Sequence, residues 1–415
     1  MSANIRLSGK RRFAAVAGPF MAMALTAGAA QAADPSLDTL LQSSETPTYS
    51  RVATIKIPGN PLTAFDISFV DRILPLYYLA DRSNASLDII NTLNNTVLKQ
   101  IGGFVGVRND PVTMKPSNDI SGPDGVQKVG LSEVWVGDGD SSVKVVDLFS
   151  MSVVATVSTT LEGHTADQDK RADEMAYDPR DHILVVANNA AIPPFITMIS
   201  TRPDDRRVLG HLVYSDAEGV EQSVYNPVNG LFYVNLTQVG DDPNSGAVSV
   251  VDPRTMAEVT RFPVTGCNGA GLALGPRQKL LVGCSLPNNS QIISARDGTL
   301  LAEIPEISGS DEVWYNPGDR KFYLAARTNP ASTGGPSLGV IDAVTNKFVT
   351  SVPTDVSAHS VAADRRTNNV FVPLGPIMND PECISGCIAV YNGHEDEGKV
   401  EHDAERFTSD LSAPN

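Results

Sequence analysis

Short apolar runs rich in Val, Ile, Tyr and Phe recur along the chain, and each is bounded by Gly, Pro, Asn or Asp. Runs of this kind predict β-strands joined by tight turns, because β-branched and aromatic side chains suit a pleated sheet. Long helical periodicity is absent. The clearest copy of the repeated unit covers 221–262, with runs at 222–225, 231–234, 247–252 and 257–262 and the turn Asn226-Pro227.

The same order of segments occurs seven times. Its second strand is recognised at 76–79, 134–136, 183–186, 231–234, 280–282, 322–324 and 370–372. The spacing from one copy to the next runs from 42 residues (Leu280 to Phe322) to 58 residues (Leu76 to Val134). This length fits a four-stranded propeller blade and exceeds most helical repeats. The sequence therefore predicts an all-β, seven-bladed β-propeller.

The two ends of the repeat region predict how the ring closes. The seventh copy ends its inner strands at 387–392 and continues as the charged segment 394–397, with no clear outer strand. An additional strand, 51–57, precedes the first copy. Because a propeller avoids an open sheet edge, we expect this N-terminal strand to complete the last blade. The predicted domain is 50–400, with a lead-in at 33–49 and a polar tail at 401–415.

Several repeat segments resemble the YVTN-type, or YncE-like, propellers of bacterial periplasmic and surface proteins. They are Val145-Val146-Asp147, Val250-Val251-Asp252 and Val340-Ile341-Asp342, together with the turns Tyr177-Asp178-Pro179 and Tyr315-Asn316-Pro317. The resemblance spans about 50–392 and implies the fold. It does not imply one activity, because such propellers host many functions.

The N-terminus has the layout of a cleavable secretory signal over 1–32. A basic start is followed by an apolar stretch and by Ala30-Gln31-Ala32,. The pair Arg11-Arg12 faintly resembles a twin-arginine signal, but the general secretory route is favoured. We expect a periplasmic or secreted protein without a membrane span. The formal net charge of −16 disfavours nucleic acid as a partner, because phosphate binding needs Lys and Arg,.

The four cysteines fit an oxidising compartment,. Cys383 and Cys387 lie close together in a loop and suggest a local disulfide. The predicted topology places Cys267 at the start of a first strand and Cys284 at the end of the strand that pairs with it. This favours a second disulfide over a thiolate metal site or a nucleophile.

Acidic residues gather at the predicted start of each inner strand, where all blades converge on one mouth of the central channel. Alignment of the copies on the turn residue gives Asp66, Asp124, Asp173, Glu221, Ala270, Asp311 and His359, and the next position adds Glu174, Gln222 and Glu312. In the fifth blade Asn268 lies slightly earlier. Converging carboxylates repel one another unless a cation, raised pKa values or water offsets the repulsion.

One hypothesis for this ring is a divalent metal ion. Comparison with propeller lactonases, which hold calcium or a similar ion with Glu, Asn and Asp, implies the ligands Glu174, Glu221, Asn268, Glu312 and His359. Carboxylates favour calcium or magnesium, whereas a histidine ligand suits a transition metal. The alternative is that these are ordinary solvated or structural side chains of the channel rim.

Neighbouring segments extend the candidate site. The long loop 159–172 leads directly into Asp173 and contains His164, Asp167, Asp169 and Lys170. The segment 103–123 is long enough to form a lid. Second strands end on the same face with Asn188, Asn189, Asn235 and Arg327.

Two classes of function fit this arrangement. The first is a binding propeller that takes a small ligand, a metal or a partner protein at its acidic mouth, with Asp66, Asp124, Glu221, Gln222 and Arg327 as ligand contacts. The second is a metal-dependent hydrolase or lyase, in which the ion activates water and Asp173 or Asp311 is the general base. The chain carries no G-x-S-x-G, H-E-x-x-H, P-loop or C-x-x-C-H motif,. The sequence therefore does not decide between the two classes.

Overall fold

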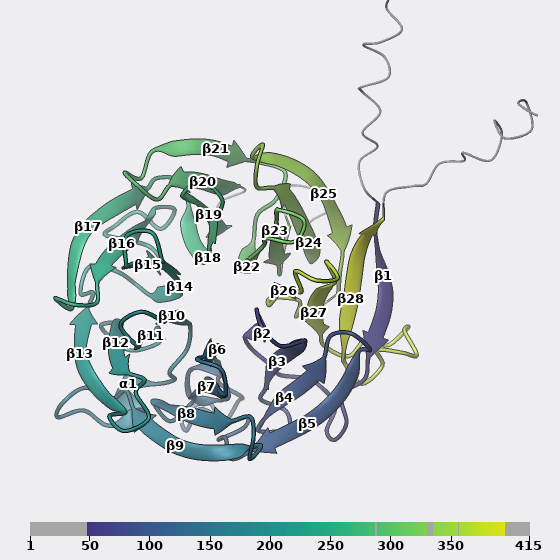
Figure 1. Ribbon diagram of the computed structural model, residues 1–415, viewed down its shortest axis with the longest axis horizontal. Helices are drawn as coiled ribbons and strands as arrows, with labels where there is room; N and C mark the ends of the chain where they lie inside the picture. The colour runs from purple at the N-terminus through teal and green to yellow at the C-terminus, as the bar shows by residue number, and fades with distance from the viewer. Residues whose placement is uncertain (1–47, 287–288, 330–334, 356, 395–415) are drawn as a thin grey trace, which may run out of the picture. The chain divides into compact units, whose positions relative to one another are not determined.

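A computed structural model describes residues 48–286, 289–329, 335–355 and 357–394, which lie in one compact unit. These residues form seven four-stranded antiparallel sheets arranged as the blades of a β-propeller around a central channel (Figure 1). The predicted all-β, seven-bladed fold is confirmed. The predicted signal 1–32, most of the lead-in 33–49 and the tail 401–415 lie outside the described residues.

The strands of each blade follow one another from the channel to the rim (Figure 1). Blades one to three consist of β2 (Ser68–Val70), β3 (Leu76–Asp81), β4 (Ser86–Asn91) and β5 (Thr96–Gly102); β6 (Val126–Val129), β7 (Glu133–Asp138), β8 (Ser142–Asp147) and β9 (Ser152–Ser158); and β10 (Met175–Asp178), β11 (Ile183–Asn188), β12 (Phe195–Ser200) and β13 (Arg207–Val213).

Blades four to six consist of β14 (Val220–Asn226), β15 (Leu231–Leu236), β16 (Gly246–Asp252) and β17 (Ala257–Val264); β18 (Asn268–Gly275), β19 (Lys279–Leu286), β20 (Ser290–Ser294) and β21 (Leu300–Ile304); and β22 (Ser310–Asn316), β23 (Lys321–Ala326), β24 (Ser337–Asp342) and β25 (Lys347–Pro353). Blade seven consists of β26 (Ala362–Ala363), β27 (Val370–Leu374), β28 (Cys387–His394) and β1 (Thr48–Ile55).

The N-terminal strand closes the ring, as predicted. β1 pairs antiparallel with β28, with Thr54 opposite Ala389 and Ile55 opposite Ile388. This pairing satisfies backbone groups that β28 would otherwise leave at an open edge. The strand spans Thr48–Ile55 rather than the predicted 51–57. The Tyr49 hydroxyl also lies 3.2 Å from that of Tyr323 in blade six, so the closing strand contacts the neighbouring blade.

Burial differs along each blade and explains the apolar runs. All six residues of β11 are buried, whereas the outer strand β9 alternates between exposed and partly buried positions. The middle strands pack between two neighbouring blades, and Trp135 of blade two shares a core with Leu184 of blade three. Strands of a sheet that is covered on both faces have continuous hydrophobic sequences, rather than sequences that alternate between apolar and polar residues.

The turns after the inner strands are built on Asp and Asn side chains. Asp71 Oδ1 accepts from Ile73 N at 2.7 Å, and Asp178 Oδ1 accepts from Arg180 N at 2.8 Å. An Asx side chain that bonds the backbone two residues ahead promotes such a turn. These turns lie on the face opposite the acidic mouth, because each inner strand runs from the mouth to the turn.

Both predicted disulfides are present, Cys267–Cys284 and Cys383–Cys387. The first joins the inner strand region of blade five to β19, where Gly269 lies opposite Cys284. Disulfides are consistent with an oxidising, extracellular-type compartment. Within the described residues no helix has the length and apolar character of a membrane span, and α1 (Ala166–Asp169) is the one α-helix.

Candidate functional site

A polar cavity of about 270 Å³ lies at the mouth of the channel. Its lining includes eight residues predicted from the sequence: Asp66, Asp173, Glu174, Glu221, Asp311, Glu312, Arg327 and His359. Most of them lie at the start of an inner strand, so seven-fold repetition brings residues distant in sequence to one opening. The structure therefore assembles most of the predicted acidic ring.

Three other residues that were predicted as metal or ligand contacts do not line this cavity. Gln222 bonds between blades, because its Oε1 accepts from Leu272 N at 2.7 Å and from Val313 N at 3.2 Å. Asn268 donates from Nδ2 to the carbonyl oxygen of Pro243 at 2.9 Å. Asp124 is fully buried and contacts Arg82, which does line the cavity.

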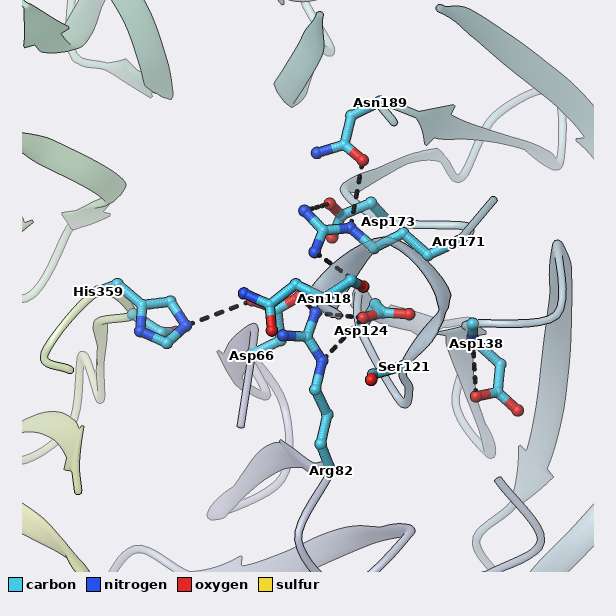
Figure 2. Close-up of polar contacts among 12 residues, drawn as sticks. Asp66, Arg82, Asn118, Ser121, Asp124, Asp138, Arg171, Asp173, Asn189 and His359 are labelled. Carbon is cyan, nitrogen blue, oxygen red and sulfur yellow. Dashed lines mark hydrogen bonds and ion pairs between the residues drawn. The ribbon is translucent and has the colours of Figure 1, made fainter. Parts of the chain in front are cut away.

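Arg82 is the cation between two of the predicted aspartates. It directly follows β3 and is 3% exposed. Its Nε donates to Asp124 Oδ1 at 3.0 Å, and its Nη2 forms ion pairs with both Asp124 and Asp66 (Figure 2). Burial raises the pKa of Asp124 well above its ordinary value against the opposing charge of Arg82.

Arg171 is a second internal cation and comes from the long loop before β10. Its Nη2 lies 2.7 Å from Asp173 Oδ2, and its Nε donates to Asn189 Oδ1 at 3.2 Å. Its Nη1 donates to the carbonyl oxygen of Asn118 at 3.3 Å (Figure 2). Burial raises the pKa of Asp173 to about 6 although Arg171 opposes that shift, and Asp173 Oδ1 has no hydrogen-bond partner.

Three aspartates of the site are grouped closely enough to be considered as metal ligands. Asp66, Asp124 and Asp173 each offer one carboxylate oxygen, and these oxygens lie within 4.8 Å of one another. Arg82 already pairs with two of them and Arg171 with the third. A fourth pair joins Arg327 to Asp311. Guanidinium groups thus offset the charge of the aspartates.

The three glutamates have no such partner, since no ion pair of the described residues involves Glu174, Glu221 or Glu312. Glu174 of blade three and Glu312 of blade six lie close enough across the channel for each carboxyl to affect the pKa of the other. Burial, followed by the charge of Glu312, raises the pKa of Glu174 well above its ordinary value. Two neighbouring buried carboxyls without a cation favour the protonated form of at least one of them.

Burial is also the main cause of the raised pKa values of the other two glutamates. It raises the pKa of Glu312 well above its ordinary value, and Glu312 Oε1 has no hydrogen-bond partner although the residue is 2% exposed. Burial, reinforced by Asp173 and Asp311, raises the pKa of Glu221 to about 8. A cation in the cavity would favour the ionised forms of all three side chains.

His359 lies at the edge of the cavity with both ring nitrogens engaged. Nδ1 lies 2.6 Å from the carbonyl oxygen of Ser357, and Nε2 lies 3.3 Å from Asp66 Oδ1. The ring stacks on Phe65 with centroids 4.9 Å apart. Burial raises the pKa of Asp66, but Arg82 and the His359 bond outweigh it and lower that pKa overall.

The neighbouring loops and strand ends have mainly structural contacts. His164 Nδ1 lies 2.7 Å from Asp169 Oδ1 within the loop, and neither residue lines the cavity, nor do Asp167 and Lys170. The buried amide of Asn188 donates to Ser141 Oγ and Thr159 Oγ1, and Asn235 donates to Gly271 O. The segment 103–123 contributes Asn118 to the lining. Its role as a lid stays a prediction.

Sequence reasoning missed Arg82 and Arg171, two of the three arginines that line the site. A signal for Arg82 existed, because it follows the second strand of blade one at the position that Asn189 occupies in blade three. Arg171 stands two residues before Asp173, in a loop whose path only the folded chain reveals.

The fold is shared with known structures. One solved chain, described as "Crystal Structure of Mitotic Checkpoint Complex", aligns with a TM-score of 0.60 and 13% identity over 91% of this chain and 99% of that chain. No protein-family profile and no curated protein matches this sequence. Likeness at this identity concerns the fold alone, since 1613 chains of solved structures match it,. Membership of the YVTN-type family therefore stays a prediction.

Proposed function

We propose that the protein is a binding propeller that takes a divalent cation in the channel-mouth cavity, between Glu174, Glu221 and Glu312. One observation carries the proposal. The three arginines of the cavity pair with aspartates, whereas Glu174, Glu221 and Glu312 form no ion pair among the described residues. Without a cation these carboxylates repel one another or stay protonated. A cation between them is attracted to their ionised forms and stabilises those forms.

The donor set favours a hard ion such as Ca²⁺ or Mg²⁺. Glutamate oxygens are the ligands these ions prefer, and Glu312 Oε1 is buried without a hydrogen-bond partner. His359 uses both nitrogens in hydrogen bonds, which weakens the support for a transition metal. Because the pKa of Glu221 is raised to about 8, cation binding releases protons and strengthens as the pH rises towards 8.

The cavity has room for more than a bare ion. Its volume of about 270 Å³ compares with roughly 30 Å³ for the share of one water molecule in the liquid. Hydrated ions and small polar ligands fit such a space, and Asp66 and Arg327 lie in its lining. A concave site supports a small ligand better than a partner protein.

Calorimetry of the mature protein with Ca²⁺, Mg²⁺ and Mn²⁺ tests this proposal. We expect one bound ion per chain, and we expect Glu221→Gln to weaken binding about tenfold or more. Asp88→Asn is the matched control, because Asp88 is also buried with its pKa raised to about 8 but lies in β4, away from the cavity lining. The proposal is contradicted if no cation binds at pH 8, or if Asp88→Asn loses as much cation affinity as Glu221→Gln.

The second candidate is a metal-dependent hydrolase or lyase. Asp173 supports it, because its Oδ1 is buried without a hydrogen-bond partner beside the glutamates and its pKa is raised to about 6. A carboxylate of that pKa is suited to take a proton from water near neutral pH. A screen of ester and lactone hydrolysis with added Ca²⁺ tests it. Activity that Asp173→Asn removes while Ca²⁺ still binds supports an enzyme, and no turnover counts against one.

We also propose that the protein is exported to the periplasm or secreted, and that it belongs with YVTN-type propellers. The two disulfides support export,. Mass spectrometry of the protein from the periplasmic fraction tests it, with an N-terminus at Ala33 as the expected result. A cytosolic protein that retains residues 1–32 contradicts it.

A further inference from the structure

The opening of the channel opposite the acidic cavity is surrounded by the turns that follow the inner strands. Hydrogen bonds join these turns from blade to blade. Asn226 Nδ2 donates to Gln278 Oε1 at 2.6 Å, and Asn316 Nδ2 donates to Asn368 Oδ1 at 3.1 Å. The residues at the tips of these turns are therefore held in fixed positions around one opening.

Four consecutive blades place an arginine in this turn. They are Arg277 in blade five, Arg320 in blade six, Arg365 in blade seven and Arg72 in blade one, and all four are exposed. None of them takes part in a salt bridge within the part of the chain that the structure describes. Four unpaired guanidinium groups on neighbouring turns are unusual in a chain whose formal net charge is −16.

The carboxylates of the same turns are already engaged. Asp71 is 1% exposed and accepts from Ile73 N and Leu74 N. Asp364 is fully buried and pairs with Arg366 at 3.0 Å, and Asp319 accepts from the Tyr323 hydroxyl. The aspartates that shape the turns therefore point into the protein, while the four arginines remain exposed.

The turns that carry Arg72 and Arg365 adjoin each other. The pKa of Arg72 is lowered by desolvation, followed by the positive charge of Arg365. The neighbouring Arg366 donates from Nη1 to the carbonyl oxygen of Asp71 at 3.4 Å, which ties the turn of blade seven to that of blade one. The turn of blade six also packs there, since a Cβ at Gly318 would lie 2.3 Å from the carbonyl oxygen of Arg365.

We propose that this opening binds a small multivalent anion, a molecule with two or more phosphate or carboxylate groups, between Arg72, Arg320 and Arg365. The planar guanidinium group pairs with either group through two parallel hydrogen bonds. An anion here offsets the repulsion between Arg72 and Arg365. The channel then has an anion site at one end and the acidic cavity at the other, and the two sites share no residue.

Calorimetry at low ionic strength with inorganic pyrophosphate and with citrate tests the proposal on the mature protein. We expect at least one probe to bind, and the tighter of the two identifies the phosphate or the carboxylate class. The double variant R72Q/R365Q weakens binding about tenfold or more, because each paired guanidinium contributes charge-assisted hydrogen bonds. Its thermal unfolding midpoint is measured alongside to establish that it folds.

Arg254→Gln is the matched control. Arg254 is exposed in the β16–β17 turn on the same face, but it pairs with Asp252 at 2.9 Å. We expect this variant to bind like the unmodified protein. The proposal is overturned if neither probe binds, if R72Q/R365Q binds as tightly as the unmodified protein, or if Arg254→Gln loses as much affinity. Glu221→Gln should leave anion binding unchanged, so failure here and failure of the cation site are distinguishable.

Discussion

Arg82 Nε donates to Asp124 Oδ1 over 3.0 Å, so a side chain that follows β3 in the first blade holds an aspartate that precedes β6 in the second. The same guanidinium pairs with Asp66 at the start of the first blade. One buried cation thus joins two blades at the channel mouth and offsets two of the carboxylates there.

Replacement of Arg82 by Gln is expected to destabilise the protein strongly. The change leaves Asp66 and Asp124 buried without their cation, which costs about 3–5 kcal/mol of the free energy of unfolding. Urea unfolding followed by fluorescence measures it. Arg327→Gln is the control, because that side chain is 55% exposed and an exposed ion pair contributes about 1 kcal/mol or less. If both variants lose a similar amount of unfolding free energy, burial of the Arg82 ion pairs contributes little to stability.

Stability should fall as the pH rises from 5 to 8. The pKa of Glu221 is raised from 4.5 to about 8 and that of Asp88 from 3.8 to about 8, in both cases chiefly by burial. Between those values the folded state holds protons that the unfolded state has lost, so each group lowers the free energy of unfolding by up to about 1.4 kcal/mol per pH unit. The lowered pKa of Asp66 changes the free energy of unfolding only at lower pH.

Unfolding curves of Glu221→Gln and Asp88→Asn across this pH range measure the effect. Each variant should flatten part of the slope, because each removes one titrating group. With saturating Ca²⁺, the slope that Glu221 contributes should also diminish, since a bound cation favours the ionised carboxylate. The Asp88 contribution should not change with Ca²⁺. An unfolding free energy that rises between pH 5 and 8 would refute the assignment.

The two disulfides should contribute unequally to stability. Cys267–Cys284 closes a loop with a sequence separation of 17, whereas Cys383–Cys387 has a separation of 4. On the chain-entropy account the first stabilises by about 3 kcal/mol and the second by about 2 kcal/mol. Paired Cys→Ala variants of each bridge, compared by urea unfolding, measure the difference. The reverse order would show that packing around the buried cysteines outweighs loop closure.

The sequence was informative wherever the repeat itself carried the signal. The apolar runs at the second strands recur in each blade, and turns such as Asp178-Pro179 and Asn316-Pro317 recur in several, so they predicted seven blades. The missing outer strand after 387–392 predicted the closure by β1. The alignment also predicted that Asp173, Glu221 and Asp311 face one cavity. Equivalent positions of the repeats lie at the same level of the channel, because every inner strand begins at the same face.

Local sequence does not reveal how charge is shared within that cavity. Arg82 and Arg171 lie beside the aspartates because a strand end and a long loop meet there. Gln222 bonds between blades instead, and Asn268 bonds the carbonyl oxygen of Pro243.

The sequence by itself determined the ring of blades, its closure and the cysteine pairs, since these follow from strand periodicity and turn chemistry. Only the tertiary structure decided which carboxylates are offset by arginine and which, like Glu174 and Glu312, lie beside each other without an ion-pair partner. Coulomb interactions and desolvation depend on distances of a few ångströms between blades, and those distances exist only in the closed propeller.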